Sequence, residues 1–357
     1  MIIDIVKVFT ASSAAFIVGM LITPAVTHYL YKYKAWKKNN VAVATDGRSA
    51  TITQQLHNDE KKKTPRMGGI VIWGSAFITI IAIWLVSKIF PTEITAKLDF
   101  LSRNQTWIPL FTLMAGSLVG MIDDIIEVRG NSARKAGGLS SKKRLLTVGL
   151  ISLFVAWWFF TKLGVASIGF PFLEDINIGF WFIPFFVFTA LAVYAGGVID
   201  GIDGLSGGVF AAMFAAYAGI AFYQQQINLA AFCALVVGGI LAFLWFNIPP
   251  ARFYMSETGT MGLTITLTVV AFMTDSLGGG HGVVVLPIVA FPLVITVLSV
   301  VIQLLSKKFR NGKKVFQVAP IHHHFEAIGW PTYKVTMRFW VISVIFAIIG
   351  FSIALIG

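Results

Sequence analysis

Long apolar segments alternate with shorter polar stretches along the whole chain of 357 residues. Each apolar segment is long enough to cross, as a helix, the hydrocarbon core of a bilayer, which is roughly 30 Å thick. Lipid cannot satisfy open backbone groups, and the segments are too long for barrel strands, so we expect helices. The pattern predicts an all-α polytopic membrane protein, with 1–357 as a single domain. About ten transmembrane helices are expected, at 8–30, 69–90, 107–125, 145–163, 178–198, 204–224, 228–246, 260–274, 283–305 and 336–356.

Two prolines, Pro287 and Pro292, interrupt the ninth predicted span. Proline removes a backbone donor and bends a helix, so this span is expected to be bent. A bent span would open a lateral groove into which a lipid fits.

The composition excludes several classes of protein. Charged residues make up only 12% of the chain and hydrophobic residues 57%, which is too apolar for a soluble globule or a disordered chain. The single cysteine, Cys233, rules out a disulfide framework and a cysteine-type zinc site.

The distribution of basic residues predicts the orientation in the membrane. Loops rich in Lys and Arg face the cytoplasm, so both termini are expected outside it. The net charge of +12 then reflects loops facing an anionic leaflet, and no nucleic-acid partner is expected. Of the 28 Lys and Arg residues, nine lie in 32–66, six in 129–144, one at Arg252 and seven in 307–338.

Five carboxylates fall at predicted helix ends on the cytoplasmic side: Asp123, Asp124, Asp200, Asp203 and Glu257. Carboxylates at membrane depth are costly and usually functional. Adjacent carboxylates repel each other unless a cation or a proton neutralises them, and Mg²⁺ prefers carboxylate oxygens. Together with the basic loops, this pattern favours a metal-assisted site that handles phosphate. Solvated helix ends and a capped turn are the alternatives.

Three further segments carry candidate chemistry. His322, His323 and His324 lie in a basic cytoplasmic stretch, where histidine can bind a metal or phosphate. The basic run that begins at Lys61 precedes Gly68-Gly69, whose N–H groups could bind a phosphate at a helix start; contact with anionic lipid is the alternative. Tyr254 lies beside Glu257 and could stack on a base, or the segment could be a hinge.

Taken together, these segments resemble the bacterial phospho-N-acetylmuramoyl-pentapeptide transferases of the polyprenyl-phosphate N-acetylhexosamine-1-phosphate transferase superfamily. The resemblance runs from about Lys61 to the C-terminus. Its most specific part is Ala-Pro-Ile-His-His-His-Phe-Glu at 319–326, followed by Gly329-Trp330 and Arg338-Phe339-Trp340. The matching motifs also include Thr64-Pro65, Met67-Gly68-Gly69, Asp123-Asp124, Asp200-Gly-Ile-Asp-Gly-Leu205 and Trp245-Phe-Asn247.

The resemblance implies a homodimer of ten-span subunits in the bacterial plasma membrane, with its site on the cytoplasmic face. It implies transfer of phospho-MurNAc-pentapeptide from UDP-MurNAc-pentapeptide to undecaprenyl phosphate, with Mg²⁺ as cofactor, giving lipid I and UMP in peptidoglycan biosynthesis. A transferase for another UDP-N-acetylhexosamine and a membrane transporter are the alternatives.

Roles follow from the resemblance only where positions match. The implied catalytic residues are Asp123, Asp124, Asp200, Asp203, His322, His323 and His324. The implied metal ligands are Glu257 and Asp200. The implied substrate-binding residues are Lys61, Asn247, Tyr254, Gln303 and Arg144.

Five positions depart from the family pattern. Glu257 stands where the family has aspartate, which lengthens the carboxylate by one methylene. Arg144 and Glu127 stand where it has lysine, so the first keeps a positive charge and the second reverses it. Tyr194 and Gly197 replace asparagines. The chain is therefore interpreted as a divergent member whose site is remodelled, turned to another sugar nucleotide, or weakened.

Overall fold

Helices account for most of the chain that the computed structural model describes, which comprises residues 1–36, 63–101, 105–130 and 138–356. Two short antiparallel strands, β1 (Ser167–Ile168) and β2 (Ile176–Asn177), form one hairpin. The α-helices are α1 (Ile2–Lys32), α3 (Ile70–Ile89), α4 (Glu93–Leu98), α5 (Trp107–Arg129), α6 (Ser141–Lys162), α7 (Phe182–Ala195), α8 (Leu205–Tyr223), α9 (Ile227–Asn247), α10 (Ser256–Met273), α11 (Gly282–Val289), α12 (Phe291–Phe309), α13 (Ile321–Ala327) and α14 (Thr332–Ile356). Three 3-10 helices, η1 (Gly179–Trp181), η2 (Gly196–Ile199) and η3 (Ser276–Gly278), complete the described elements.

Nine helical segments within the described ranges are long and apolar enough to cross a membrane. This finding confirms the prediction of an all-α polytopic membrane protein. The predicted span 260–274 corresponds to α10, which is not among the nine. Five threonines make α10 less apolar than its neighbours, yet every residue of this helix except Glu257 is buried.

The ninth predicted span, 283–305, is not one bent helix but two helices. α11 ends at Val289 and α12 begins at Phe291, with Ala290 between them. Pro292 lies in the first turn of α12, where a residue without an N–H group costs no helical hydrogen bond. The continuity predicted for this span is therefore wrong, and the sequence signal that marks the break is Pro292.

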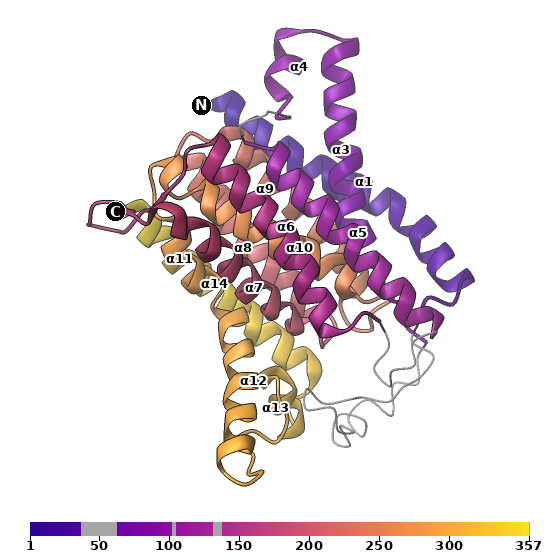
Figure 1. Cartoon of the computed structure of the whole chain (residues 1–357). Coiled ribbons are helices and arrows are strands. Elements are labelled where there is room, and N and C mark those ends of the chain that lie inside the picture. The colour runs from indigo at the N-terminus through magenta and orange to yellow at the C-terminus, as the bar shows by residue number, and fades with distance from the viewer. Residues whose placement is uncertain (37–62, 102–104, 131–137, 357) are drawn as a thin grey trace.

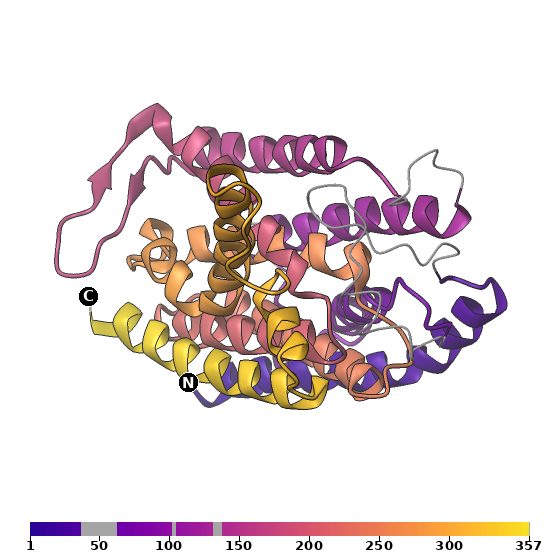
Figure 2. The ribbon, with the colours of Figure 1, turned by 90° about the horizontal axis from the view of Figure 1, so that it is seen from below.

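The helices pack around α10 in an elongated arrangement. Seen from below in Figure 2, α6 lies along one long edge, and α1 and α14 lie along the opposite edge. Figure 1 shows α12 and α13 extending below the other helices, and the end of α3 with α4 projecting at the top. The N-terminus lies on the same side as α4.

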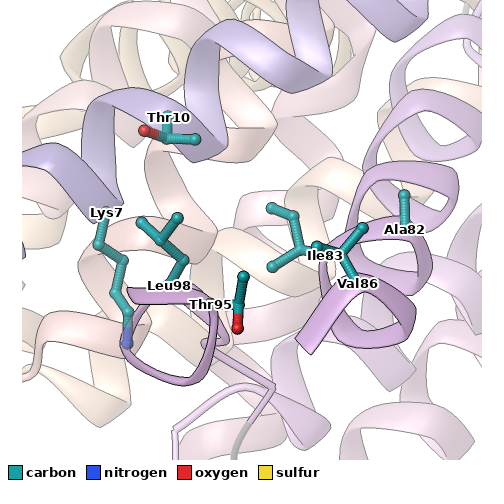
Figure 3. Close-up of a pocket in the computed structure, with 7 residues that line it drawn as sticks. All are labelled: Lys7, Thr10, Ala82, Ile83, Val86, Thr95 and Leu98. Atoms are coloured by element: carbon teal, nitrogen blue, oxygen red, sulfur yellow. The ribbon is translucent and has the colours of Figure 1, made fainter. Parts of the chain in front are cut away.

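A cavity of about 160 Å³ lies near the N-terminal part of α1. Its lining is almost wholly apolar, and Figure 3 shows its residues coming from α1, α3 and α4. Among them, Ile83 and Val86 are in the last two turns of α3. The first turn of α3 packs against the start of α10. Because α3 has 20 residues, its two ends lie roughly 30 Å apart. The cavity is therefore remote from the predicted carboxylate cluster.

Candidate active site

Close packing of α5 on α10 brings three of the predicted carboxylates to one place. At Gly120 of α5, a Cβ atom would lie 2.0 Å from the backbone oxygen of Glu257, and at Gly116 it would lie 2.8 Å from Cα of Gly262. Glycine therefore allows the two backbones to touch one turn before Asp123 and Asp124. Both aspartates are fully buried beside the first turn of α10.

Asp124 belongs to one carboxylate–arginine–carboxylate group. Nε of Arg66 lies 3.3 Å from Asp124 Oδ1, and Nη2 of the same guanidinium lies 3.2 Å from Glu127 Oε2. The other oxygen of Asp124 accepts hydrogen bonds from the backbone N–H (2.9 Å) and the hydroxyl (2.6 Å) of Thr258. Asp124 thus holds the start of α10 against α5, and the negative charge of Glu127 is balanced by Arg66.

Asp123 belongs to a second group of the same kind. Nη2 of Arg144 lies 2.8 Å from Asp123 Oδ2, and Nη1 donates to Glu257 Oε1 at 2.9 Å. The hydroxyl of Tyr194 donates to the other oxygen of Glu257 at 3.2 Å. The backbone N–H of Leu139 donates to Asp123 Oδ1. Two carboxylates from α5 and α10 therefore converge on one guanidinium from α6.

At Gly138 the backbone passes directly against the ion pair of Asp123 and Arg144. It has φ +66°, and a Cβ atom there would lie 2.9 Å from both Arg144 Nη2 and Asp123 Oδ1. A side chain at this position would therefore be strained and would collide with the ion pair.

The loop after α7 brings Asp200 and Asp203 to the start of α10. Asp200 accepts hydrogen bonds from the Ser206 hydroxyl and from the backbone N–H of Ser256, both at 2.7 Å. Burial raises the pKa of the Asp200 carboxyl, although these two hydrogen bonds oppose the shift. Asp203 accepts from the backbone N–H of Ala251 at 2.9 Å. The two aspartates therefore fix loop geometry as well as carrying charge.

Asn247 joins the aspartate loop to the segment before α10. Its Oδ1 accepts from the N–H of Gly204 at 3.0 Å, and its Nδ2 donates to the carbonyl of Phe253 at 2.8 Å. The residue is 2% exposed, so the structure gives this amide a structural use. A role in substrate binding stays a prediction.

Asn247→Leu is expected to destabilise the fold by about 2 kcal/mol, because two buried backbone groups lose their partners. Thermal unfolding in detergent measures the effect. Asn177→Ala serves as the control, since the amide oxygen of Asn177 accepts from Gly179 N–H at the exposed end of β2, where water can replace it. Equal melting temperatures for wild type and Asn247→Leu would refute the structural use.

The predicted histidines meet the aspartate loop at Gly201. A Cβ atom at Gly201 would lie 2.7 Å from Nε2 of both His322 and His323. His323 lies 2.6 Å from Glu326 through Nδ1, and His322 is fully buried. His324 differs from the other two, because its Nδ1 accepts from Gln317 N–H and its ring packs on Phe316.

The structure places two more of the predicted substrate-binding residues, whose role in binding stays a prediction, and the third lies outside its described part. Gln303 accepts from the N–H groups of Val315 and Phe316 and closes the turn after α12. Tyr254 is half-buried, and its backbone bonds to Pro65 and Gly68. Lys61 lies outside the described residues.

The possible phosphate site at Gly68-Gly69 is not supported. Their N–H groups donate to the carbonyl oxygens of Tyr254 and Met255, at 2.7 and 3.2 Å. These hydrogen bonds instead hold the segment that carries Arg66 beside the start of α10.

Among the residues of the site that were not predicted, Arg66 and Tyr194 bind its carboxylates. Arg66 lies in the basic run singled out above, but no local pattern shows that it pairs with Asp124 and Glu127. Tyr194 was considered only as the replacement of a family asparagine, whereas its hydroxyl donates a hydrogen bond to Glu257. A third, Glu326, follows the histidines by three residues and pairs with His323, a spacing that places both on one helix face.

The donor set fits a hard divalent cation. Mg²⁺ in proteins is typically held by one or two carboxylates together with substrate phosphates and waters. Asp123 and Glu257 supply two carboxylates that both contact the guanidinium of Arg144. The formal charge of these three side chains together is −1, which leaves the group attractive to a metal ion. Within the part of the chain that the structure describes, no three His, Cys, Asp or Glu side chains form a complete metal cage. Substrate oxygens would have to complete the coordination.

The sequence is similar to known transferases. The profile of glycosyl transferase family 4 matches residues 106–275. A phospho-N-acetylmuramoyl-pentapeptide-transferase from Anoxybacillus flavithermus is 33% identical over 351 residues, which cover 98% of each chain. A protein of the same name from Rickettsia bellii is 34% identical, over 82% of this chain and 80% of its own. Another, from Listeria innocua, is 31% identical over 96% and 97%.

Proposed function

Because the chain belongs to the phospho-N-acetylmuramoyl-pentapeptide-transferase family, it is a membrane-embedded phospho-sugar transferase of peptidoglycan synthesis, and we propose its specific reaction. It transfers phospho-MurNAc-pentapeptide from UDP-MurNAc-pentapeptide to undecaprenyl phosphate, giving lipid I and UMP. The reaction takes place on the cytoplasmic face of the bacterial plasma membrane, depends on Mg²⁺, and is carried out by a homodimer.

One observation carries this proposal: three segments far apart in sequence meet at one end of the helix bundle. The Asp123-Asp124 pair touches the start of α10, the Asp200–Asp203 loop touches Ser256, and the histidines touch Gly201. Carboxylates, arginines and histidines are thus gathered where a diphosphate, a lipid phosphate and a cation can meet. Phosphoryl transfer needs such positioning and charge stabilisation more than it needs covalent chemistry.

In the proposed reaction, some residues of the site hold other residues in position and others bind the phosphate groups. Asp124 accepts three hydrogen bonds or ion-pair contacts and is a positioning residue that fixes Arg66 and Thr258. Arg144 is 24% exposed and presents positive charge for phosphate oxygens. His322 and His323 lie at Gly201 of the aspartate loop, whose Asp200 binds the start of α10, and they would bring further positive charge or donors to the diphosphate.

The lipid phosphate provides the nucleophile. Its oxygen forms a bond to the β-phosphorus of the UDP sugar, and the bond from that phosphorus to the bridging oxygen breaks, so that UMP leaves. Phosphate is largely ionised at neutral pH, so no strong base is required. Mg²⁺ would be held by Glu257 and Asp123, and it would offset the negative charge of the diphosphate when bound. Asp123 is preferred to the predicted ligand Asp200, because both oxygens of Asp200 already accept hydrogen bonds from Ser206 and Ser256.

The test uses the purified full-length protein with undecaprenyl phosphate, UDP-MurNAc-pentapeptide and Mg²⁺. We expect equal amounts of UMP and lipid-linked product. Omission of the lipid acceptor should stop UMP release, and UDP-N-acetylglucosamine should not replace the muramoyl substrate. Turnover of UDP-N-acetylglucosamine alone would assign a different sugar nucleotide. Solute flux in liposomes without UMP release would support a transporter instead.

A further inference from the structure

Arg144 lies at the point where Asp123 and Glu257 would share a metal ion. Its two terminal nitrogens lie 2.8 Å from Asp123 and 2.9 Å from Glu257. A divalent cation bound by both carboxylates would be within a few ångströms of the guanidinium, and like charges at that separation repel strongly in a partly buried site. Arg144 and a metal ion therefore compete for the same oxygens.

The present position of Arg144 leaves part of its binding capacity unused. Its Nε is buried and has no hydrogen-bond partner among the described residues. Its contact with Asp123 is an ion pair that lacks good hydrogen-bond geometry, since Asp123 Oδ2 also has no hydrogen bond there. A guanidinium has five donors, and a diphosphate could satisfy more of them than these two carboxylates do.

We propose that Arg144 is an exchangeable cation, an inference that rests on the proposed phosphoryl transfer. Before substrate binds, Arg144 neutralises Asp123 and Glu257 and keeps them together. When Mg²⁺ arrives with the diphosphate, Arg144 leaves Glu257 and binds the diphosphate oxygens. Tyr194 keeps its hydrogen bond to the other oxygen of Glu257, so the carboxylate stays in place during the exchange.

Arg66 provides a matched comparison within the same site. It too bridges two carboxylates, and its side chain is 25% exposed, against 24% for Arg144. It contacts Asp124 and Glu127 but not Glu257. Asp124 is additionally bound by two donors of Thr258. Loss of either arginine removes one positive charge from the site, but only loss of Arg144 frees Glu257.

The experiment measures Mn²⁺ binding by electron paramagnetic resonance, with full-length protein in detergent and no substrate present. Arg144→Gln is expected to bind Mn²⁺ about tenfold to a hundredfold more tightly than wild type, the equivalent of one charge-assisted hydrogen bond removed from competition. Arg66→Gln is expected to change binding less than about threefold, since its charge is more distant. Glu257→Gln in the Arg144→Gln background should abolish the tight site.

Arg144→Lys is a second variant for the case that Arg144→Gln does not fold, because it keeps the positive charge at this position. A lysine ammonium cannot bridge both carboxylates as the forked guanidinium does. Its Mn²⁺ affinity should lie between those of wild type and Arg144→Gln. Wild-type affinity in both Arg144 variants would overturn the inference. So would an equal gain in Arg66→Gln, which would show a general charge effect. Since no substrate is present, this result is independent of whether the wild type releases UMP.

Discussion

Glu257→Gln is expected to lower the rate of UMP release by about a thousandfold at saturating Mg²⁺, the scale of loss when a charge-stabilising group is removed from an active site. Glutamine keeps the length and shape of the side chain. It removes the negative charge that, in the proposed reaction, holds the metal together with Asp123. It also turns one of the two oxygens that accept from Arg144 and Tyr194 into an NH2 donor.

Glu257→Asp is the matched control, because it keeps the charge and shortens the side chain by one methylene, as in the family pattern. It should retain activity within about tenfold, since a carboxylate still faces the cation. Melting temperatures of both variants separate a chemical effect from loss of the fold. Activity of Glu257→Gln close to that of wild type would mean that the metal is held by other residues.

The residue types of the site could be predicted from the sequence, but their pairing could not. Asp123, Asp124 and Glu257 stood out because carboxylates at predicted helix ends are costly. Arg144 lies 113 positions from Glu257, and Arg66 lies 58 positions from Asp124. No local pattern encodes such contacts, because they arise where α6 and the segment before α3 meet the α5–α10 contact.

Four of the departures from the family pattern that the resemblance implies are explained by their contacts with one another or with Arg66. Glu257, Arg144 and Tyr194 form one hydrogen-bonded group, so the longer carboxylate is matched by a longer, forked cation and a phenol donor. Glu127, a reversal of charge, is balanced by Arg66. Each substitution viewed alone suggests a damaged site, but the contacts show that each has a partner. This favours a remodelled site over an inactive one.

The sequence predicted the membrane-spanning helices, but it did not predict two details of how they pack. Apolar length predicts helices well, because a bilayer leaves few alternatives. It does not show that α10, with its threonines, is the most enclosed helix, since helices of similar hydropathy can face lipid or protein. Nor does apolar length show that one helix ends at Val289 and the next begins at Phe291, a break that only Pro292 marks in the sequence.

Gly120→Ala is expected to lower the melting temperature by on the order of 5 °C and to reduce UMP release at least tenfold. The new methyl group would lie 2.0 Å from the backbone oxygen of Glu257. Because that atom belongs to the backbone of a buried helix, it can move only if α5 and α10 separate. Such a separation would also draw Asp124 away from Thr258 and widen the gap between Asp123 and Glu257 that Arg144 bridges.

Gly149→Ala is the matched control, since it makes the same change in the middle of α6, where a Cβ atom meets nothing within 4 Å. Alanine there should leave the melting temperature unchanged or raise it slightly, because it restricts the unfolded chain and favours the helix. If Gly120→Ala behaved like Gly149→Ala in both assays, the contact of α5 with α10 would not set the geometry of the site. A loss confined to Gly120→Ala would show that catalysis depends on how closely these two backbones approach.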